Sequence, residues 1–103
     1  MSSNTARKDV LYEIQYTKAA EKFMRNREDV RTEYENAIHE LLIGEHPESI
    51  NIKRIMGKHA VYYRIRLGNY RVVYTTVNEM IVVICTILAG PRGDVYKKMN
   101  GLK

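Results

Sequence analysis

Hydrophobic and polar residues alternate most clearly along Ala60–Leu67 and Asn69–Val77. The Gly-Asn pair between these segments is typical of a two-residue β-hairpin turn, because glycine accepts the positive φ that such a turn requires. Successive side chains of a strand point to opposite faces, so Tyr62, Arg64 and Arg66 share one face of the first strand. The apolar residues between them share the other face. We therefore predict two antiparallel strands with a core face and a face of arginine and tyrosine side chains.

The first half of the chain changes from strand alternation to a helical period. Val10–Tyr16 suits a first strand, and Thr17 is a residue type that caps helices, so we predict a helix from Lys18 to about Asn26. A second helix is expected from about Glu28 to Ile43, where apolar residues recur three and four positions apart. The two helices follow each other almost directly, which predicts a helical hairpin. In the first helix we expect three side chains to face inward, namely Ala19, Ala20 and Phe23.

Strand signals dominate the second half of the chain. Asn51–Ile55 is a short candidate, and Met80–Leu88, after a tight turn at Asn78-Glu79, is the most apolar run and is expected to be the central, fully buried strand. Gly90-Pro91 should break this strand, and Arg92–Lys103 should form a polar, basic tail with two apolar anchors, Val95 and Met99. The order β-α-α-β-β-β-β predicts an α+β fold with helices on one face of a largely antiparallel sheet and the other face open.

The length of 103 residues suits a single domain, which we place at residues 10–103. Residues 1–9 are polar and have no apolar h-region, so we expect a flexible N-terminal lead-in and no signal peptide. No apolar run approaches the ~20 residues of a membrane span. The single cysteine, Cys85, lies in an apolar run and is predicted to be a buried structural thiol. These features favour a cytoplasmic protein.

Charge is distributed unevenly along the chain. The net charge is +5, but residues 1–50 sum to −3 and residues 51–103 sum to +8. The basic half contains only two acidic residues, Glu79 and Asp94, whereas a merely solubilising surface usually mixes both signs. An anionic partner, either nucleic acid or an acidic protein segment, is therefore expected.

Arginine and tyrosine are the residue types left to carry chemistry. The three histidines are scattered and the sequence has no glycine-rich phosphate loop, so we expect no metal site and no cofactor. Cleavage of RNA needs no protein nucleophile, because the substrate's own 2′-OH attacks the phosphate. Arginine binds phosphate through its planar fork, and tyrosine can move a proton if positive charge favours its phenolate. The predicted catalytic residues are Arg64, Arg66, Arg71, Arg92 and Tyr96. The predicted substrate-binding residues are Lys53, Arg54, Lys58, Lys97 and Lys98.

Three segments resemble the RelE branch of the RelE/ParE toxin superfamily: Tyr63–Tyr74, Ala89–Tyr96 and the opening Tyr12–Ala20. The resemblance extends over roughly Val10 to Lys98. It implies the toxin of a type II toxin–antitoxin pair that cleaves mRNA in the ribosomal A site, without metal, by attack of the 2′-OH. It further implies that the arginines bind phosphate and stabilise charge. The matching C-terminal tyrosine, Tyr96, would stack on a base or assist the 2′-OH.

The sequence departs from the best-known members of this branch, which carry lysines where this chain has Arg64 and Arg66. Arginine cannot replace a lysine that carries protons, so Tyr96 would have a larger share of that work. Two other readings stay open: a ParE-like inhibitor of DNA gyrase, and a non-catalytic RNA-binding module. The expected partners are mRNA on the ribosome and a cognate antitoxin, whose acidic helix or extended segment would block the cationic surface.

Overall fold

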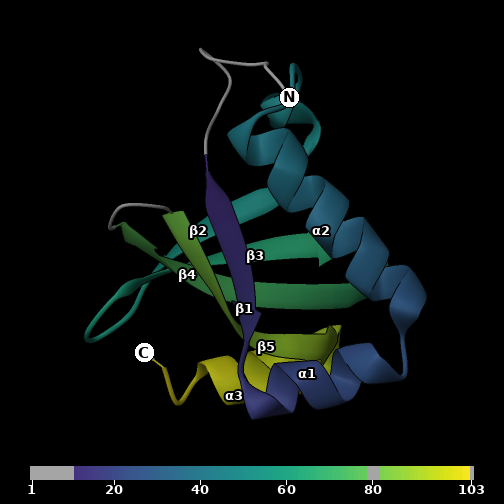
Figure 1. Cartoon of the computed structure of the whole chain (residues 1–103). Coiled ribbons are helices and arrows are strands. Elements are labelled where there is room, and N and C mark those ends of the chain that lie inside the picture. The colour runs from purple at the N-terminus through teal and green to yellow at the C-terminus, as the bar shows by residue number, and fades with distance from the viewer. Residues whose placement is uncertain (1–10, 79–81, 103) are drawn as a thin grey trace.

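The computed structural model describes residues 11–78 and 82–102 (Figure 1). The elements in chain order are β1 (Tyr12–Tyr16), α1 (Lys18–Arg25), α2 (Glu28–Leu42), the short 3-10 helix η2 (Pro47–Ser49), β2 (Ile52–Met56), β3 (Val61–Leu67), β4 (Tyr70–Asn78), β5 (Val82–Pro91) and α3 (Arg92–Met99). The predicted lead-in, residues 1–9, lies outside the described residues, as does Glu79 of the predicted Asn78-Glu79 turn. So do the first residue of the predicted first strand, Val10, and the first two of the predicted Met80–Leu88 strand.

The five strands form one mixed sheet in the order β1-β5-β4-β3-β2. β1 is parallel to β5, and the other three strand pairs are antiparallel, which confirms the largely antiparallel α+β fold. The prediction of a central strand at Met80–Leu88 is wrong, because β4 occupies the middle of the sheet and β5 lies between β1 and β4. Gly90-Pro91 also does not break β5. Both residues continue the ladder, with Gly90 opposite Arg71 and Pro91 opposite Tyr70.

Thr17 begins α1 and also attaches this helix to the sheet. Its hydroxyl oxygen accepts a hydrogen bond from the backbone N–H of Ala20 at 3.2 Å, which confirms the predicted N-cap. The same hydroxyl donates to the carbonyl of Ile87 at 2.8 Å. Ile87 lies at an irregularity in the β4–β5 register, where Tyr74 pairs with Thr86 and Val73 with Leu88.

The larger part of the core lies between the sheet and helices α1 and α2. Val30, Tyr34, Ala37 and Ile38 of α2 are buried on the predicted apolar stripe, against β-strand residues that include Ile65. Figure 1 shows α2 running diagonally across this face of the sheet. The apolar face of β3 therefore enters the core, as its alternation predicted.

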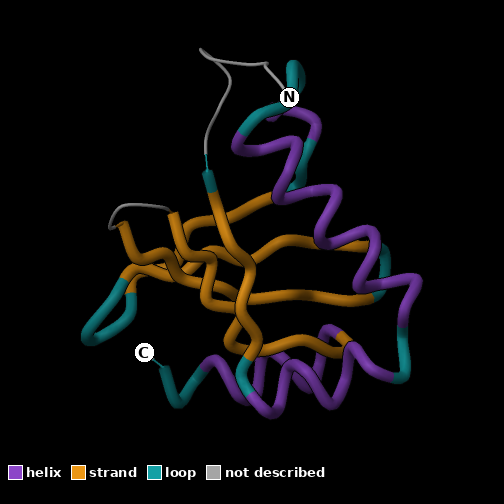
Figure 2. Tube along the Cα trace, viewed as in Figure 1, coloured by secondary structure: helices purple, strands orange, loops and turns teal. Residues whose placement is uncertain are grey.

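The second face of the sheet is not open as predicted, because the expected tail forms α3 (Figure 2). Val95 and Met99, four residues apart on one side of this helix, are buried against Val73 of β4. Asp94 in the first turn and two lysines in the last turn suit the helix dipole. The two residues named as anchors are thus the buried side of a helix that covers part of the sheet.

Two predictions of burial are wrong. Ala19 is exposed, because α1 turns Ala20 and Met24, four residues apart, toward the sheet. Cys85 is half-buried rather than buried. It alternates with the buried residues Ile84 and Thr86, so it lies on the face opposite α2.

Candidate functional site

The predicted catalytic residues meet at the end of the β3–β4 hairpin, where α3 begins. A cavity of about 520 Å³ is lined by Arg64, Arg66, Gly68, Asn69, Arg71, Arg92 and Tyr96. Arg64 and Arg66 come from β3, Arg71 from β4, and Arg92 and Tyr96 from α3. The structure thus brings together all five residues that we predicted to be catalytic.

Two backbone features fix the geometry of this end of the sheet. Gly68 has a φ of +63°, the left-handed conformation that the tight hairpin turn requires. The backbone N–H of Arg92 donates to the carbonyl of Asn69 at 3.1 Å, which ties the first residue of α3 to that turn. The hairpin and the helix therefore hold the cavity walls in a fixed relation.

Arg71 is the most deeply buried charged residue of the cavity, with 6 % of its surface exposed. Its Nη1 donates to the carbonyls of Gly68 at 2.9 Å and Tyr70 at 3.0 Å. Within the described part of the chain, the Nε atoms of Arg71 and Arg64 are the buried side-chain polar atoms without a hydrogen-bond partner. A buried N–H without a partner is costly, so the fold holds these two arginines here at a cost in stability. Both residues line the cavity, and guanidinium groups make the cavity suited to an anion.

Tyr96 is surrounded by guanidinium groups. Arg64 Nη1 donates to its hydroxyl at 3.1 Å, and the guanidinium carbon of Arg92 lies 5.3 Å from the centre of its ring. The guanidinium group of Arg92, followed by those of Arg71 and Arg64, lowers the pKa of Tyr96 to about 8, because donated hydrogen bonds and positive charge favour the phenolate. A tyrosine whose pKa is lowered toward neutrality is a candidate for proton transfer.

Like charges face each other directly in the β3–β4 ladder, at two of the residues that line the cavity. Arg66 of β3 pairs with Arg71 of β4, and Arg66 is exposed while Arg71 is buried. Two like charges opposite each other destabilise a strand pair. No acidic residue is among the described residues that line the cavity. The fold therefore concentrates positive charge at this point at some cost to its own stability.

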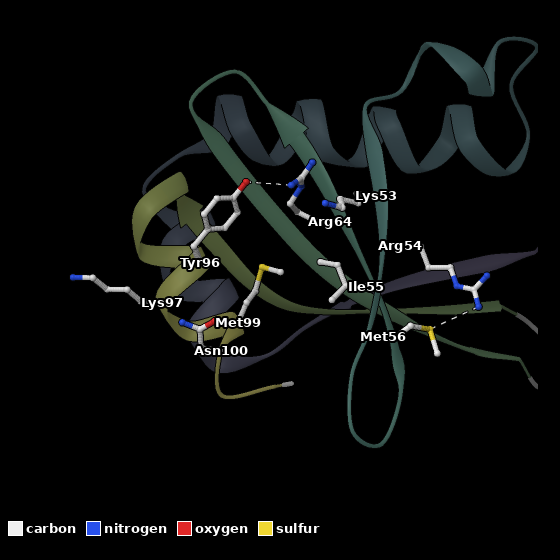
Figure 3. A pocket seen from close by; sticks show the side chains of 9 residues that line it. All are labelled: Lys53, Arg54, Ile55, Met56, Arg64, Tyr96, Lys97, Met99 and Asn100. Carbon is white, nitrogen blue, oxygen red and sulfur yellow. Dashed lines mark hydrogen bonds between the residues drawn. The ribbon is translucent and has the colours of Figure 1, made fainter.

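A larger cavity of about 720 Å³ adjoins the first and shares Arg64 and Tyr96 with it (Figure 3). Of the predicted substrate-binding residues, Lys53, Arg54 and Lys97 line it. Lys53 lies opposite Arg64 in the β2–β3 ladder and points toward it. The side chain of Arg54 points away, and its Nη2 donates a hydrogen bond to the sulfur of Met56. The other two predicted residues, Lys58 and Lys98, are exposed and line neither cavity.

Sequence reasoning missed the apolar part of this second cavity, which is formed by Ile55 and Met99. The alternation of β2 could have placed Ile55 on the same face as Lys53, and the spacing of Val95 and Met99 was the one signal for α3. Ile55 and Met99 come together only when α3 packs on the sheet.

Residues 11–78 and 82–102 contain no group of three or more His, Cys, Asp or Glu side chains that could hold a metal ion. No helix within these ranges is long and apolar enough to cross a membrane.

The fold and the site define a small, basic α+β protein with an arginine-lined cavity at the end of its sheet. Residues 2–92 match the family described as the ParE toxin of the type II toxin–antitoxin system parDE, so the chain belongs to this family. It is therefore a type II toxin of the RelE/ParE superfamily, which confirms the resemblance seen in the sequence.

A solved structure shows the same fold. A chain in the crystal structure of the RelB–RelE antitoxin–toxin complex from Methanococcus jannaschii superposes with a TM-score of 0.56 and 26 % sequence identity, over 82 % of this chain and 96 % of that chain. This similarity supports the RelE-like branch of the superfamily. No curated protein matches the chain.

Proposed function

We propose that this toxin is a metal-independent endoribonuclease that cleaves mRNA in the ribosomal A site by attack of the substrate's 2′-OH. One observation carries the proposal: the hydroxyl of Tyr96, with a pKa lowered to about 8, lies among guanidinium groups in a cavity whose described lining residues include no acid. Phosphodiester cleavage needs this combination, namely cationic donors for the phosphate and one group that accepts a proton.

The arginines are assigned to the phosphate. Arg71 and Arg64 line the smaller cavity, and a guanidinium group is a planar, multiple donor that matches the geometry of a phosphate. Their hydrogen bonds to phosphate oxygens would become stronger as negative charge builds up in the transition state. Arg92 and Arg66 line the same cavity and add to the positive field. Because Arg71 is anchored by two backbone carbonyls, it holds its position before substrate arrives.

Tyr96 is assigned to the proton of the 2′-OH. Of the described residues that line the smaller cavity, it is the one side chain that can exchange a proton near neutral pH. Its phenolate accepts the proton while the 2′ oxygen forms a bond to phosphorus. The P–O5′ bond breaks, and the leaving 5′ oxygen takes a proton from water. The products are an upstream fragment with a 2′,3′-cyclic phosphate and a downstream fragment with a 5′-hydroxyl.

A cognate antitoxin is the expected protein partner in the cytoplasm. The similar chain from Methanococcus jannaschii was solved in an antitoxin–toxin complex. The basic half of this chain would attract an acidic helix or extended segment, which would cover the arginines and keep the toxin inactive.

The family match favours one competing function, inhibition of DNA gyrase, because the matched family is the ParE family. An inhibitor of this kind binds an enzyme and needs no proton acceptor of its own. Gyrase inhibition makes no use of the tyrosine among the arginines. The two functions therefore differ in whether they require Tyr96.

Controlled expression in a bacterial host without antitoxin separates the functions. We expect growth arrest and, by primer extension, new 5′ ends within the codons of a translated mRNA that vanish when translation is blocked. Tyr96→Phe should abolish both effects, while Tyr12→Phe, which also removes one phenol hydrogen bond but lies far away on β1, should leave them unchanged. Arrest with intact mRNA and broken DNA would establish the gyrase inhibitor instead. RNA binding without cleavage would indicate a plain binding module.

A further inference from the structure

The larger cavity between β2 and the last turn of α3 has a composition that phosphate binding does not require. Its floor is apolar. It is formed by Ile55, which is half-buried, and by Met99, of which 7 % is exposed. Figure 3 shows both side chains pointing into the space between β2 and α3. A phosphate group gains nothing from such a surface, whereas the flat face of a nucleobase does.

Charged and hydrogen-bonding side chains surround this apolar floor. Lys53 and Arg64 stand together on one side, and Lys97 extends outward from α3 at the edge. The amide of Asn100, an exposed residue, can both donate and accept a hydrogen bond. None of the described lining residues is acidic. The chemistry of the cavity therefore matches a ligand with an apolar face, a polar edge and negative charge.

The position of the cavity limits what can fill it. Arg64 and Tyr96 line both cavities, and the hydrogen bond between them forms the partition. A ligand in the larger cavity is thus in contact with the two side chains that would hold the phosphate and move the proton. In a nucleic acid, the groups adjacent to a phosphate are the two nucleosides that it links.

We infer that the larger cavity binds the base of a nucleotide that flanks the scissile phosphate, with the base on Ile55 and Met99. Lys53 faces the next backbone phosphate, and Asn100 contacts the edge of the base. The inference rests on the proposed function, because it presupposes a phosphate in the smaller cavity. An acidic, apolar peptide segment is the other ligand with this chemistry, but the partition shared with the phosphate cavity favours the nucleotide.

Binding of uncleavable dinucleotides tests this inference without any need for catalysis. The probes are a 2′-O-methyl adenosine dinucleotide and two counterparts, one lacking the 5′-side base and one lacking the 3′-side base. Each is titrated at low ionic strength into the isotope-labelled full-length toxin, and affinity is measured by NMR. Loss of one of the two bases should weaken binding by about tenfold, the effect of removing roughly 1.4 kcal/mol of contact, while loss of the other should change it little.

A protein variant assigns the lost contact to the cavity. Ile55→Ala should weaken binding of the intact dinucleotide but not of the counterpart that lacks the critical base. Ile52→Ala is the matched control, because Ile52 is equally half-buried on the same strand but packs on the α2 face. It should leave both affinities unchanged, and thermal unfolding should show that both variants are folded.

The outcomes separate this inference from the proposed function. Equal binding of all three probes would overturn the base pocket while leaving the phosphate site intact. No binding of any probe would overturn the phosphate site and the inference together. If Ile55→Ala weakens binding of the cognate antitoxin and leaves binding of the dinucleotide unchanged, the cavity binds a peptide segment and the inference is wrong.

Discussion

The lowered pKa of Tyr96 predicts how cleavage depends on pH. With a pKa of about 8, about a tenth of Tyr96 is phenolate at pH 7 and about half at pH 8. If the phenolate is the proton acceptor, the rate rises about tenfold per pH unit below pH 7 and levels off above pH 8. If Tyr96 is the one group that sets the rate, the profile has one rising limb and no descending limb below pH 9.

Removal of Arg92 should move this limb to higher pH, because its guanidinium group makes the largest contribution to the lowered pKa of Tyr96. Each unit by which the pKa rises lowers the phenolate fraction at pH 7 about tenfold. The assay is cleavage of mRNA on purified ribosomes between pH 6 and pH 9, with Arg92→Gln compared with Arg25→Gln, which removes an exposed charge from α1. Arg25→Gln should retain the original inflection. A rate that stays constant with pH, or an inflection that Arg92→Gln does not move, would refute the role of Tyr96 as a base.

Three further predictions concern stability and are read from thermal or urea unfolding. Gly68→Ala should lower the free energy of unfolding by about 1 kcal/mol, because Gly68 has a φ of +63°. Gly93→Ala should raise it by about 0.5 kcal/mol, because Gly93 is at a helical position with open space around it. Tyr34→Phe should cost about 1–2 kcal/mol by leaving the buried hydroxyl of Thr86 unpaired, and the added change Thr86→Val should recover most of this loss. Arg66→Ala should raise stability by a few tenths of a kcal/mol at low salt, by relieving the like charge opposite it, and this gain should shrink as salt is added.

The site could be predicted where it depends on strand alternation. The period of two along β3 placed Arg64 on one face and Ile65 in the core, and the structure has both as expected. The uneven charge of the chain pointed to the same half of the molecule. Local pattern is sufficient for such features because each depends on residues a few positions apart.

The parts that depend on α3 could not be predicted in the same way. This helix has only eight residues, and Val95 and Met99 are its two buried positions, so its apolar period is too short to distinguish it from a tail. The burial of Arg71 also had no signal, since an arginine on a strand is usually exposed. It is buried because α3 and the hairpin turn close around it, which is a property of the tertiary fold.

If the substrate's own 2′-OH performs the attack, removal of that group must abolish cleavage. Ribosomes are programmed with an mRNA that carries a single 2′-deoxynucleotide at the mapped cleavage position, and the purified toxin is added. We expect no cleavage at that position, and a 2′,3′-cyclic phosphate with a 5′-hydroxyl at the same position in the all-ribose mRNA. Cleavage of the deoxy-substituted mRNA, or a 5′-phosphate on the downstream fragment, would show that the 2′-OH is not the nucleophile.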